Sequence, residues 1–389
     1  MPKPNLPLDF CTACGACVSV CNRDALRLDS DEEGFYIPFC DELKCVGCKK
    51  CELACHILNA DYPRVAPSLV EAIMLKANDK EVVKTSSSGG VFSLLANDII
   101  KKGGVVYGAA YDYENEVLKC SSTKESSIDS LKKSKYVESY MGKTFQKIGL
   151  DLKENRFVLF CGTPCQCRGL RSYIKCMKLS SQNLLIVRFI CHGVPSNRFL
   201  IEYKHWMEEK RKSKIVAIDF RPKTYGWSTQ SMKIDFENGK VYTQPHILDP
   251  YLTSFYEGVN LRKACYSCCY EKENFADLTI GDFWGIHFYH PENNEQDGLS
   301  VALLHTEKGK YFLDKIKEYC LIERLTSSAI EYLFRDDYSK KRSKRDSFMN
   351  EALEKGYMPT VLNYFAFQMQ KNKFRWFLSR FKHLVKSFV

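Results

Sequence analysis

The segment CTACGACVSVC, residues 11–21, places four cysteines at the spacing C-x2-C-x2-C-x3-C, and CVGCKKCELAC, residues 45–55, repeats that spacing without change. Three cysteines two residues apart let one tight loop bind three corners of a 4Fe-4S cube, and a fourth thiolate must come from elsewhere. In a two-cluster arrangement the fourth ligand belongs to the other motif. The spacing therefore predicts two 4Fe-4S clusters, one held by Cys11, Cys14, Cys17 and Cys55 and the other by Cys45, Cys48, Cys51 and Cys21.

Small residues between these cysteines, such as Gly15 and Gly47, leave room for the backbone to approach a cluster closely. A pair of four-cysteine zinc sites is the alternative, but zinc sites rarely use three cysteines at this spacing. Residues 1–60 resemble bacterial two-cluster ferredoxins. They depart from that pattern after the fourth cysteine of each motif, where Asn22 and His56 replace the usual proline.

The composition is that of a globular protein, with 389 residues, 45% hydrophobic and 27% charged, which suits two or three domains. Nineteen residues are cysteine. In a reducing compartment such cysteines indicate metal or redox chemistry rather than disulfides. No apolar run is long enough to span a membrane, and the N-terminus lacks the pattern of a secretory signal. We therefore expect a cytoplasmic protein.

Three regions differ in composition. Residues 1–60 are cysteine-rich and acidic, and a linker signal at Asn59–Pro63 separates them from residues 68–338. In the second region short apolar runs alternate with helical patterns, which predicts an α/β domain with a mixed sheet. Residues 339–389 form a basic tail with 12 Lys and Arg against 3 Asp and Glu. The fold class we expect is a small ferredoxin-like domain, a larger α/β domain and a helical tail.

Apolar runs and turn signals locate the elements of the second region. The predicted helices span residues 91–101 and 198–210. Asn238-Gly239 predicts a hairpin between 232–236 and 241–244. The other predicted strands are residues 105–109, 157–160, 184–190, 215–220 and 278–280.

Polar and cysteine-containing loops follow several of these strands. Ser86–Gly90 leads directly into a helix, so its backbone N–H groups predict a phosphate site, although an ordinary helix cap would look the same. The loops Cys161–Gln166 and Cys191–Ser196 begin at carboxyl ends of strands, where open α/β sheets bind ligands. Cys265 and Cys268 form a C-x2-C pair that suggests metal binding with partners among the loop cysteines.

Five segments give these loops a specific resemblance: SSSGGVFSLL (86–95), KSKYVES (133–139), FCGTPCQCRGL (160–170), CHGVPS (191–196) and LTIGDFWGI (278–286). They are similar, in this order, to signature segments of the coenzyme F-420 hydrogenase/dehydrogenase beta-subunit family. Together with the ferredoxin-like repeat, the resemblance covers residues 1–345. It implies an iron–sulfur flavoprotein whose FAD exchanges hydride with a two-electron partner and single electrons with the clusters.

The resemblance also implies roles for individual residues. Ser87, Ser88, Gly89 and Gly90 would bind the FAD phosphates, and Lys135, Tyr136, Thr163 and Pro164 would line the flavin pocket. A third cluster would use Cys165, Cys191, Cys265 and Cys268, the alternative being that these are reduced core cysteines. His192 is the candidate for catalytic proton transfer, although a structural histidine is an equal reading. Asp282 would orient the flavin or simply form a turn.

The basic tail carries an apolar stripe at helical spacing. Its members are Phe374, Phe377, Leu378, Phe381, Leu384, Val385 and Phe388. The stripe predicts either packing on the protein's own body or peripheral contact with an anionic membrane. The run from Lys340 to Arg345 would attract phosphates or an acidic redox partner, and nucleic acid is disfavoured because no aromatic residue is interleaved in it.

The function predicted from these features is an oxidoreductase that passes electrons between 4Fe-4S clusters and FAD. The FAD would exchange hydride with a deazaflavin (coenzyme F-420) or a small organic substrate, in the latter case in polysaccharide biosynthesis, where relatives with this domain order occur. Ferredoxin or another redox protein is the expected partner. A non-catalytic, polyferredoxin-like subunit of a hydrogenase or dehydrogenase complex is the main alternative, and an iron–sulfur protein that binds nucleic acid is a third.

Overall fold

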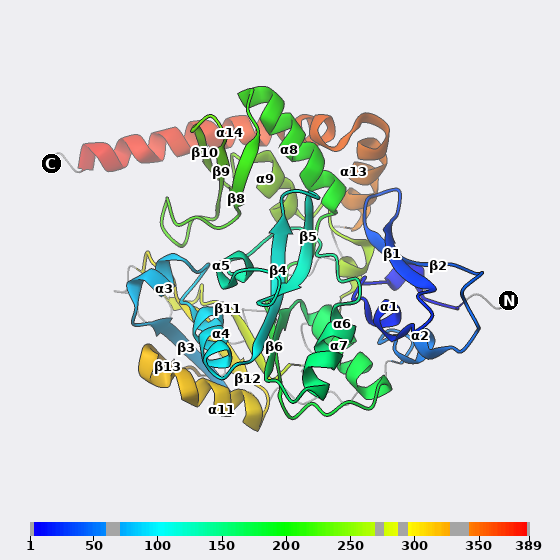
Figure 1. The fold of residues 1–389 in the computed structure, drawn as a ribbon. Helices are drawn as coiled ribbons and strands as arrows, with labels where there is room; N and C mark the ends of the chain where they lie inside the picture. Colours follow the sequence, from blue (N-terminus) through cyan, green and yellow to red (C-terminus); the bar gives the residue numbers. More distant parts are fainter. Residues whose placement is uncertain (1–3, 60–70, 269–275, 287–294, 327–341, 387–389) are drawn as a thin grey trace.

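The computed structural model describes residues 4–59, 71–268, 276–286, 295–326 and 342–386, with side chains described from Lys344 to Trp376 in the last range. A small N-terminal domain lies beside a large sheet with helices on both faces, and a smaller sheet with further helices lies above it (Figure 1). This arrangement confirms the predicted α/β architecture. The proposed boundary at residues 60–68 and the start of the tail at residue 339 lie outside the described residues.

The two cysteine motifs fold in the same way. The N-terminal domain contains η1 (Leu8–Phe10), α1 (Ala16–Val20), α2 (Lys50–Leu53) and an antiparallel hairpin of β1 (Leu26–Ser30) and β2 (Tyr36–Cys40). Each short helix begins one residue before the third cysteine of its motif. Left-handed backbone at Gly15 and Lys49 turns each loop into its helix, so the two cysteine loops adopt similar turns.

The large sheet is mixed, with parallel pairs at its centre and antiparallel pairs toward its edges. Its strands among the described residues are β3 (Glu71–Ala77), β4 (Val105–Asp112), β5 (Val117–Ser122), β6 (Val158–Gly162), β7 (Leu184–Phe189), β11 (Leu278–Asp282), β12 (Ser300–Leu304) and β13 (Cys320–Arg324). They lie in the order β13-β3-β12-β11-β7-β6-β4-β5. The predicted strands at 105–109, 157–160, 184–190 and 278–280 all belong to it.

Both faces of the central strands are covered, which explains their continuous apolar sequences. Leu159 and Leu185 pack toward α4 (Val91–Lys101) and α11 (Glu307–Ile316). Phe160 and Ile186 point the other way, into a core shared with α6 (Thr144–Lys153), α7 (Pro164–Cys176) and the buried residues of the N-terminal domain. The two cysteine motifs therefore share one hydrophobic core with the α/β body (Figure 1).

The predicted strand 215–220 and the Asn238-Gly239 hairpin form a separate, smaller sheet. It consists of β8 (Ile215–Asp219), β9 (Ser231–Phe236) and β10 (Val241–Pro245), all antiparallel. This sheet packs with α8 (Asn197–Arg211), α9 (Pro250–Glu257) and the C-terminal helices around a second core. The remaining described helices are α3 (Lys80–Lys84), α5 (Ile128–Leu131), η3 (Lys263–Ser267) and η5 (Lys317–Tyr319).

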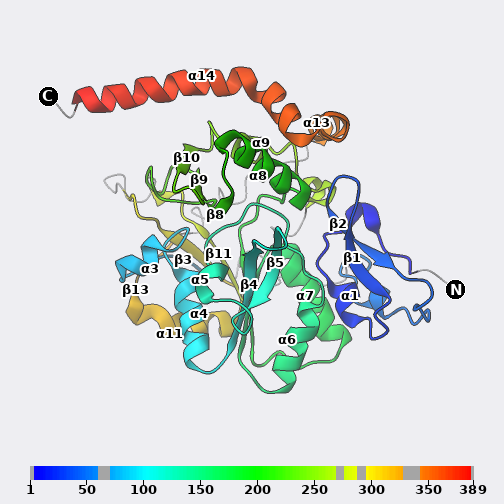
Figure 2. The ribbon, with the colours of Figure 1, turned by 45° about the horizontal axis from the view of Figure 1, so that its top comes forward.

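The tail forms two helices, α13 (Arg342–Lys355) and α14 (Tyr357–Lys386). Their first part is buried on the body through residues such as Phe348, Tyr357 and Phe365, whereas the end of α14 extends beyond it (Figure 2). Phe374 of the predicted stripe is 66% exposed, and the stripe from Phe377 onward lies outside the described side chains. No helix in the described ranges is both long and apolar enough to cross a membrane.

The prediction that the basic run at 340–345 is a ligand-attracting surface is wrong for Arg345. Its side chain is 1% exposed and forms an ion pair with Glu33 of the N-terminal domain. Its Nε also donates to the carbonyl oxygen of Leu261 at 2.9 Å. Arg345 therefore joins the tail to the body, and residues 340 and 341 lie outside the described part of the chain.

Candidate metal centres and cofactor site

The structure brings together the four cysteines predicted to hold the first cluster. Cys11, Cys14, Cys17 and Cys55 line one cavity together with His56. Burial raises the pKa of the Cys17 thiol well above its usual range, and the other three cysteines act on it as neighbouring charges. Cys55 comes from the second motif, so its position agrees with the crossed arrangement of ligands. Iron binding by this group remains a prediction.

The second set of four is more exposed and has a fifth thiol beside it. Cys48 is exposed, and it lies near enough to Cys51 to raise the pKa of that thiol, which burial brings to about 11. Cys40, at the end of β2, interacts with both Cys45 and Cys21, and burial raises its own pKa to about 11. Sequence reasoning missed Cys40 because it belongs to neither cysteine motif.

The four body cysteines also come together, although they lie on three separate segments. Cys165 is in the first turn of α7, Cys191 follows β7, and Cys265 and Cys268 lie in and after η3. Burial raises the pKa of the Cys191 thiol, and Cys265, Cys165 and Cys268 all act on it as neighbours. The donors of the predicted third cluster thus share one site.

The extra thiols differ in position from this third set. Cys167 is buried, and its Sγ lies 3.7 Å from the carbonyl oxygens of both Gly162 and Val187, so it is a packing residue of α7. Cys161 lies near Lys135, whose charge lowers a thiol pKa that burial raises to about 12. Cys269 lies outside the described residues.

These sulfur groups fit a polynuclear cluster by their chemistry. Each set supplies four thiols, the ligand set of a 4Fe-4S centre. In the described ranges no group of three or more His, Cys, Asp or Glu side chains is arranged to hold a single metal ion. Binding to iron would deprotonate the thiols, whose pKa values burial otherwise raises.

The Ser-Gly loop before α4 is mostly engaged within the protein. The Ser88 hydroxyl donates to the carbonyl oxygen of Leu299 at 2.5 Å, and the Gly89 N–H donates to Ser300 Oγ at 2.8 Å. Ser87 Oγ accepts from the N–H of Ser134 at 2.8 Å. Gly90 is the left-handed N-cap of α4. Ser88 and Gly89 therefore fix the loop to β12, and FAD phosphate binding by this loop remains a prediction.

A basic cluster, defined here as Lys133, Lys135, Arg221 and Lys223, lies near this loop and includes two residues that the sequence did not single out. Lys223 Nζ donates to the carbonyl oxygens of Val83 and Ser88, at 2.6 and 3.1 Å. Burial lowers the pKa of both Lys135 and Lys223 to about 8. Two nearby carboxylates, Asp219 and Asp282, leave the basic cluster with excess positive charge.

Aromatic side chains surround the basic cluster. Trp227 and Trp284 stack with ring centroids 4.5 Å apart, and the Arg221 guanidinium lies over Trp284. Trp227 Nε1 donates to Asp282 at 2.9 Å, so Asp282 orients this stack. Tyr136, predicted to line the flavin pocket, stacks on Phe255 with centroids 4.7 Å apart. Charged and aromatic groups together suit an anionic ligand with a planar ring.

Thr163, Pro164 and His192 lie closer to the third cysteine set. Thr163 and Gln166 form a capping box at the start of α7, with Pro164 as its first residue, which positions Cys165. Thr163 Oγ1 also lies 3.1 Å from Cys165 Sγ. His192 is half-buried and directly follows Cys191, and its role in proton transfer remains a prediction.

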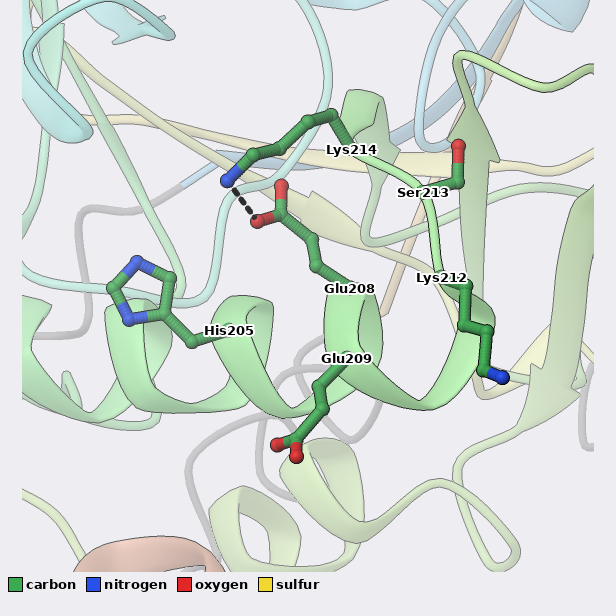
Figure 3. Close-up of a pocket in the computed structure, with 6 residues that line it drawn as sticks. All are labelled: His205, Glu208, Glu209, Lys212, Ser213 and Lys214. Atoms are coloured by element: carbon green, nitrogen blue, oxygen red, sulfur yellow. Dashed lines mark hydrogen bonds and ion pairs between the residues drawn. The ribbon is translucent and has the colours of Figure 1, made fainter.

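A shallow depression elsewhere on the surface contains none of these residues. It lies at the C-terminal end of α8, where Lys214 pairs with Glu208 at 2.9 Å (Figure 3). His205 and Glu209 point away from that pair in the same view. No predicted ligand lines this depression, and it has no part in the candidate site.

Comparisons with known proteins agree with the two-part organisation. Residues 10–57 match the model of the 4Fe-4S dicluster domain. Residues 155–327 match the family model that describes the C terminus of the coenzyme F-420 hydrogenase/dehydrogenase beta subunit. The F-type subunit of the F(420)H(2) dehydrogenase of Methanosarcina mazei is 21% identical over 367 residues, which cover 89% of this chain and 93% of that protein.

Among solved structures, a chain of the F-420-reducing nickel–iron hydrogenase complex from Methanosarcina barkeri has a TM-score of 0.46 and 17% sequence identity, covering 74% of this chain and 92% of that chain. The family match contains all four body cysteines, and the dicluster match contains both cysteine motifs. The chain thus belongs to the coenzyme F-420 hydrogenase/dehydrogenase beta-subunit family and carries a 4Fe-4S dicluster domain ahead of the family's C-terminal domain.

Proposed function

We propose that this chain is an iron–sulfur flavoprotein oxidoreductase that passes electrons between its ferredoxin-type clusters and FAD. The observation that carries the proposal is the convergence of Cys165, Cys191 and Cys265 next to the first N-terminal cysteine set. Cys165 is near enough to raise the pKa of Cys14. Adjacent sulfur sets extend from the dicluster domain into the body, as a chain of redox centres requires.

FAD is the group that would connect one-electron and two-electron chemistry, because a flavin accepts two electrons together and releases them singly. The basic cluster supports its binding, since four cations face two carboxylates there and a pyrophosphate is dianionic. Lys223 also ties the cluster to the Ser-Gly loop. The hydride partner would be coenzyme F-420 or a small organic substrate, and a role in polysaccharide biosynthesis stays a prediction.

The second cysteine set is where a protein partner, such as a ferredoxin, would exchange electrons. Cys48 is exposed, and the adjoining Leu43 and Val46 are 96% and 59% exposed. Lys49 and Lys50 lie next to Cys48 and are also exposed. An exposed ligand among apolar and basic side chains suits transient contact with an acidic redox protein.

A non-catalytic electron-transfer subunit is the second candidate. It is favoured by the relative that aligns with 89% of the chain, because that protein is named as a subunit of a dehydrogenase. Under this proposal the chain would hold the same clusters, but a partner would carry out the hydride chemistry. The two candidates differ in whether the isolated chain binds flavin.

Anaerobic purification followed by iron, sulfide and flavin analysis tests the proposal. We expect about twelve irons and one FAD per chain, whereas about eight irons means that the body holds no cluster. Flavin absent after reconstitution supports the non-catalytic subunit. The double variant Cys165→Ala, Cys191→Ala should lose about four irons and keep the N-terminal clusters. Cys320→Ala is the matched control, because Cys320 is a buried thiol whose Sγ donates to carbonyl oxygens of α11 and η5.

A further inference from the structure

Arg262 lies buried between the N-terminal domain and the third cysteine set. Its side chain is 5% exposed. Nη1 donates to the carbonyl oxygen of Cys11 at 2.9 Å, and Nη2 donates to the carbonyl oxygen of Tyr36 at 2.6 Å. Nη2 also pairs with the buried carboxylate of Glu138. Both terminal nitrogens are therefore used to hold the N-terminal domain.

The third nitrogen of this guanidinium has no partner among the described residues. Arg262 Nε is buried and makes no hydrogen bond. An unsatisfied buried donor costs about 1–3 kcal/mol, and more when the group is charged, so it calls for a specific explanation such as an unoccupied ligand site. The bonds made by Nη1 and Nη2 are enough to fix the N-terminal domain, so they do not explain the buried Nε–H.

The surroundings of Arg262 identify what would accept this hydrogen bond. The Cys265 N–H donates to the Arg262 carbonyl oxygen at 2.9 Å, so the guanidinium comes from the same turn as a predicted ligand. Its charge lowers the otherwise raised pKa values of both Cys165 and Cys265. Two thiols of the third set, on different segments, therefore lie within reach of this cation.

We propose that Arg262 Nε donates a hydrogen bond to a sulfur of the cluster held by Cys165, Cys191, Cys265 and Cys268. This inference rests on the proposed function, because it requires that cluster. Arg262 is then a positioning residue that ties the body cluster to the first N-terminal motif. N–H···S bonds and a nearby positive charge stabilise the reduced cluster, so Arg262 raises its reduction potential.

Glu138 moderates this effect, because its carboxylate neutralises part of the guanidinium charge. The variants Arg262→Lys and Arg262→Gln remove the Nε–H, and only the first keeps a positive charge. Both should shift the midpoint potential of the body cluster downward, Gln more than Lys. Glu138→Gln should shift it upward, since it leaves Arg262 without a counter-charge. Arg27→Gln, at an exposed pair in the N-terminal domain, is the matched control.

The test is a redox titration monitored by electron paramagnetic resonance, preceded by iron analysis of every protein. If the wild type holds only about eight irons, the body cluster is absent and the proposed function fails at that point. If it holds about twelve, unchanged potentials in both Arg262 variants overturn the inference alone. A shift confined to the N-terminal clusters overturns it as well.

A second measurement needs no variant that folds. Wild-type protein labelled with 15N-arginine should show a 15N coupling to the reduced body cluster in pulsed electron paramagnetic resonance. An exchangeable proton coupling should disappear in deuterated buffer. Absence of the 15N coupling in a protein that holds the cluster would show that another donor or a water occupies the site, and it would overturn the proposal.

Discussion

Gly169 of α7 lies directly against Cys14 of the first cysteine motif. A Cβ placed at Gly169 would stand 2.6 Å from Cys14 Sγ and 2.7 Å from its Cβ. Real side-chain contacts are not this short, so the glycine is what allows α7 to approach the motif. Because α7 also carries Cys165, this contact fixes the separation between the first N-terminal set and the body set.

Gly169→Ala should therefore disturb the first cluster. The added methyl group must push Cys14 away or move α7, and such overpacking costs about 1–3 kcal/mol. We expect loss of up to about four irons per chain and a lower unfolding temperature. Iron analysis and thermal unfolding measure both effects. Lys175→Ala, at an exposed position on the same helix, should retain full iron content, and an unaltered iron content in Gly169→Ala would contradict the packing argument.

The crossed assignment of ligands predicts which variants behave alike. Cys55→Ala should lose the same cluster as Cys11→Ala, although the two positions belong to different motifs, because both thiols line one cavity. Cys21→Ala should instead match Cys45→Ala. Electron paramagnetic resonance spectra of the four reduced proteins compare the remaining clusters. Matching spectra for Cys11→Ala and Cys21→Ala would mean that each motif binds its own cluster.

The buried pair of Glu138 and Arg262 should contribute strongly to stability. Removing one partner leaves an uncompensated charge in the core, which costs about 3–5 kcal/mol. Glu138→Ala should therefore lower the free energy of unfolding by this amount, as measured by denaturant titration. Asp29→Ala breaks the exposed pair with Arg27, where both side chains are 55% exposed, and should change stability by no more than about 1 kcal/mol.

Binding of FAD should weaken as the pH rises through about 8, where Lys135 loses its proton. Burial lowers the pKa of this lysine, with Asp219 and Cys161 opposing and Lys133 adding to the shift. Below that pH the ammonium attracts the pyrophosphate, and above it the attraction is lost. If binding needs the charged form, affinity should fall about tenfold between about pH 7 and about pH 9.

Isothermal titration of the flavin-free protein with FAD measures this dependence. Lys135→Arg keeps its charge throughout that range and should flatten the profile. Lys223 also has a pKa lowered to about 8, so Lys223→Arg is needed to separate the two contributions. A flat profile in the wild type would place the pyrophosphate away from the basic cluster.

Local patterns predicted the elements that local interactions define. The apolar period at 91–101 matches α4 in full, and the central parallel strands were recognisable as buried apolar runs. The edge strands β3, β12 and β13 were missed, because they pair antiparallel across more than two hundred residues in sequence and no local turn signals them. Their positions depend on contacts that a single sequence does not display.

The candidate site shows the same division. Cysteine spacing predicted the ligand groups because iron–sulfur loops have strict geometry. Arg262 and Lys223 were missed, since an isolated basic residue resembles any surface residue until its burial is known. Arg345 was misread for the converse reason, because a charged run usually faces solvent, whereas this residue pairs with Glu33 in the interior.

The end of α14 should bind anionic lipid without contributing to the fold. From Tyr357 onward the sequence contains six Lys and Arg and no acidic residue. Phe367 and Phe374, seven residues apart on one face, are 79% and 66% exposed. The core contacts of the tail end earlier, around Phe365 and Met369, so deletion of residues 377–389 should leave the unfolding temperature unchanged.

Sedimentation with vesicles of phosphatidylglycerol, compared with phosphatidylcholine, measures the lipid interaction. The full chain should bind the anionic vesicles, and added salt should weaken binding because the charges are exposed. The deletion should reduce binding at least about tenfold, and Phe374→Ala should reduce it partly, since each aromatic ring adds buried apolar area. Equal sedimentation of the full and shortened chains would instead favour a helix that packs on protein, either its own body or a partner subunit.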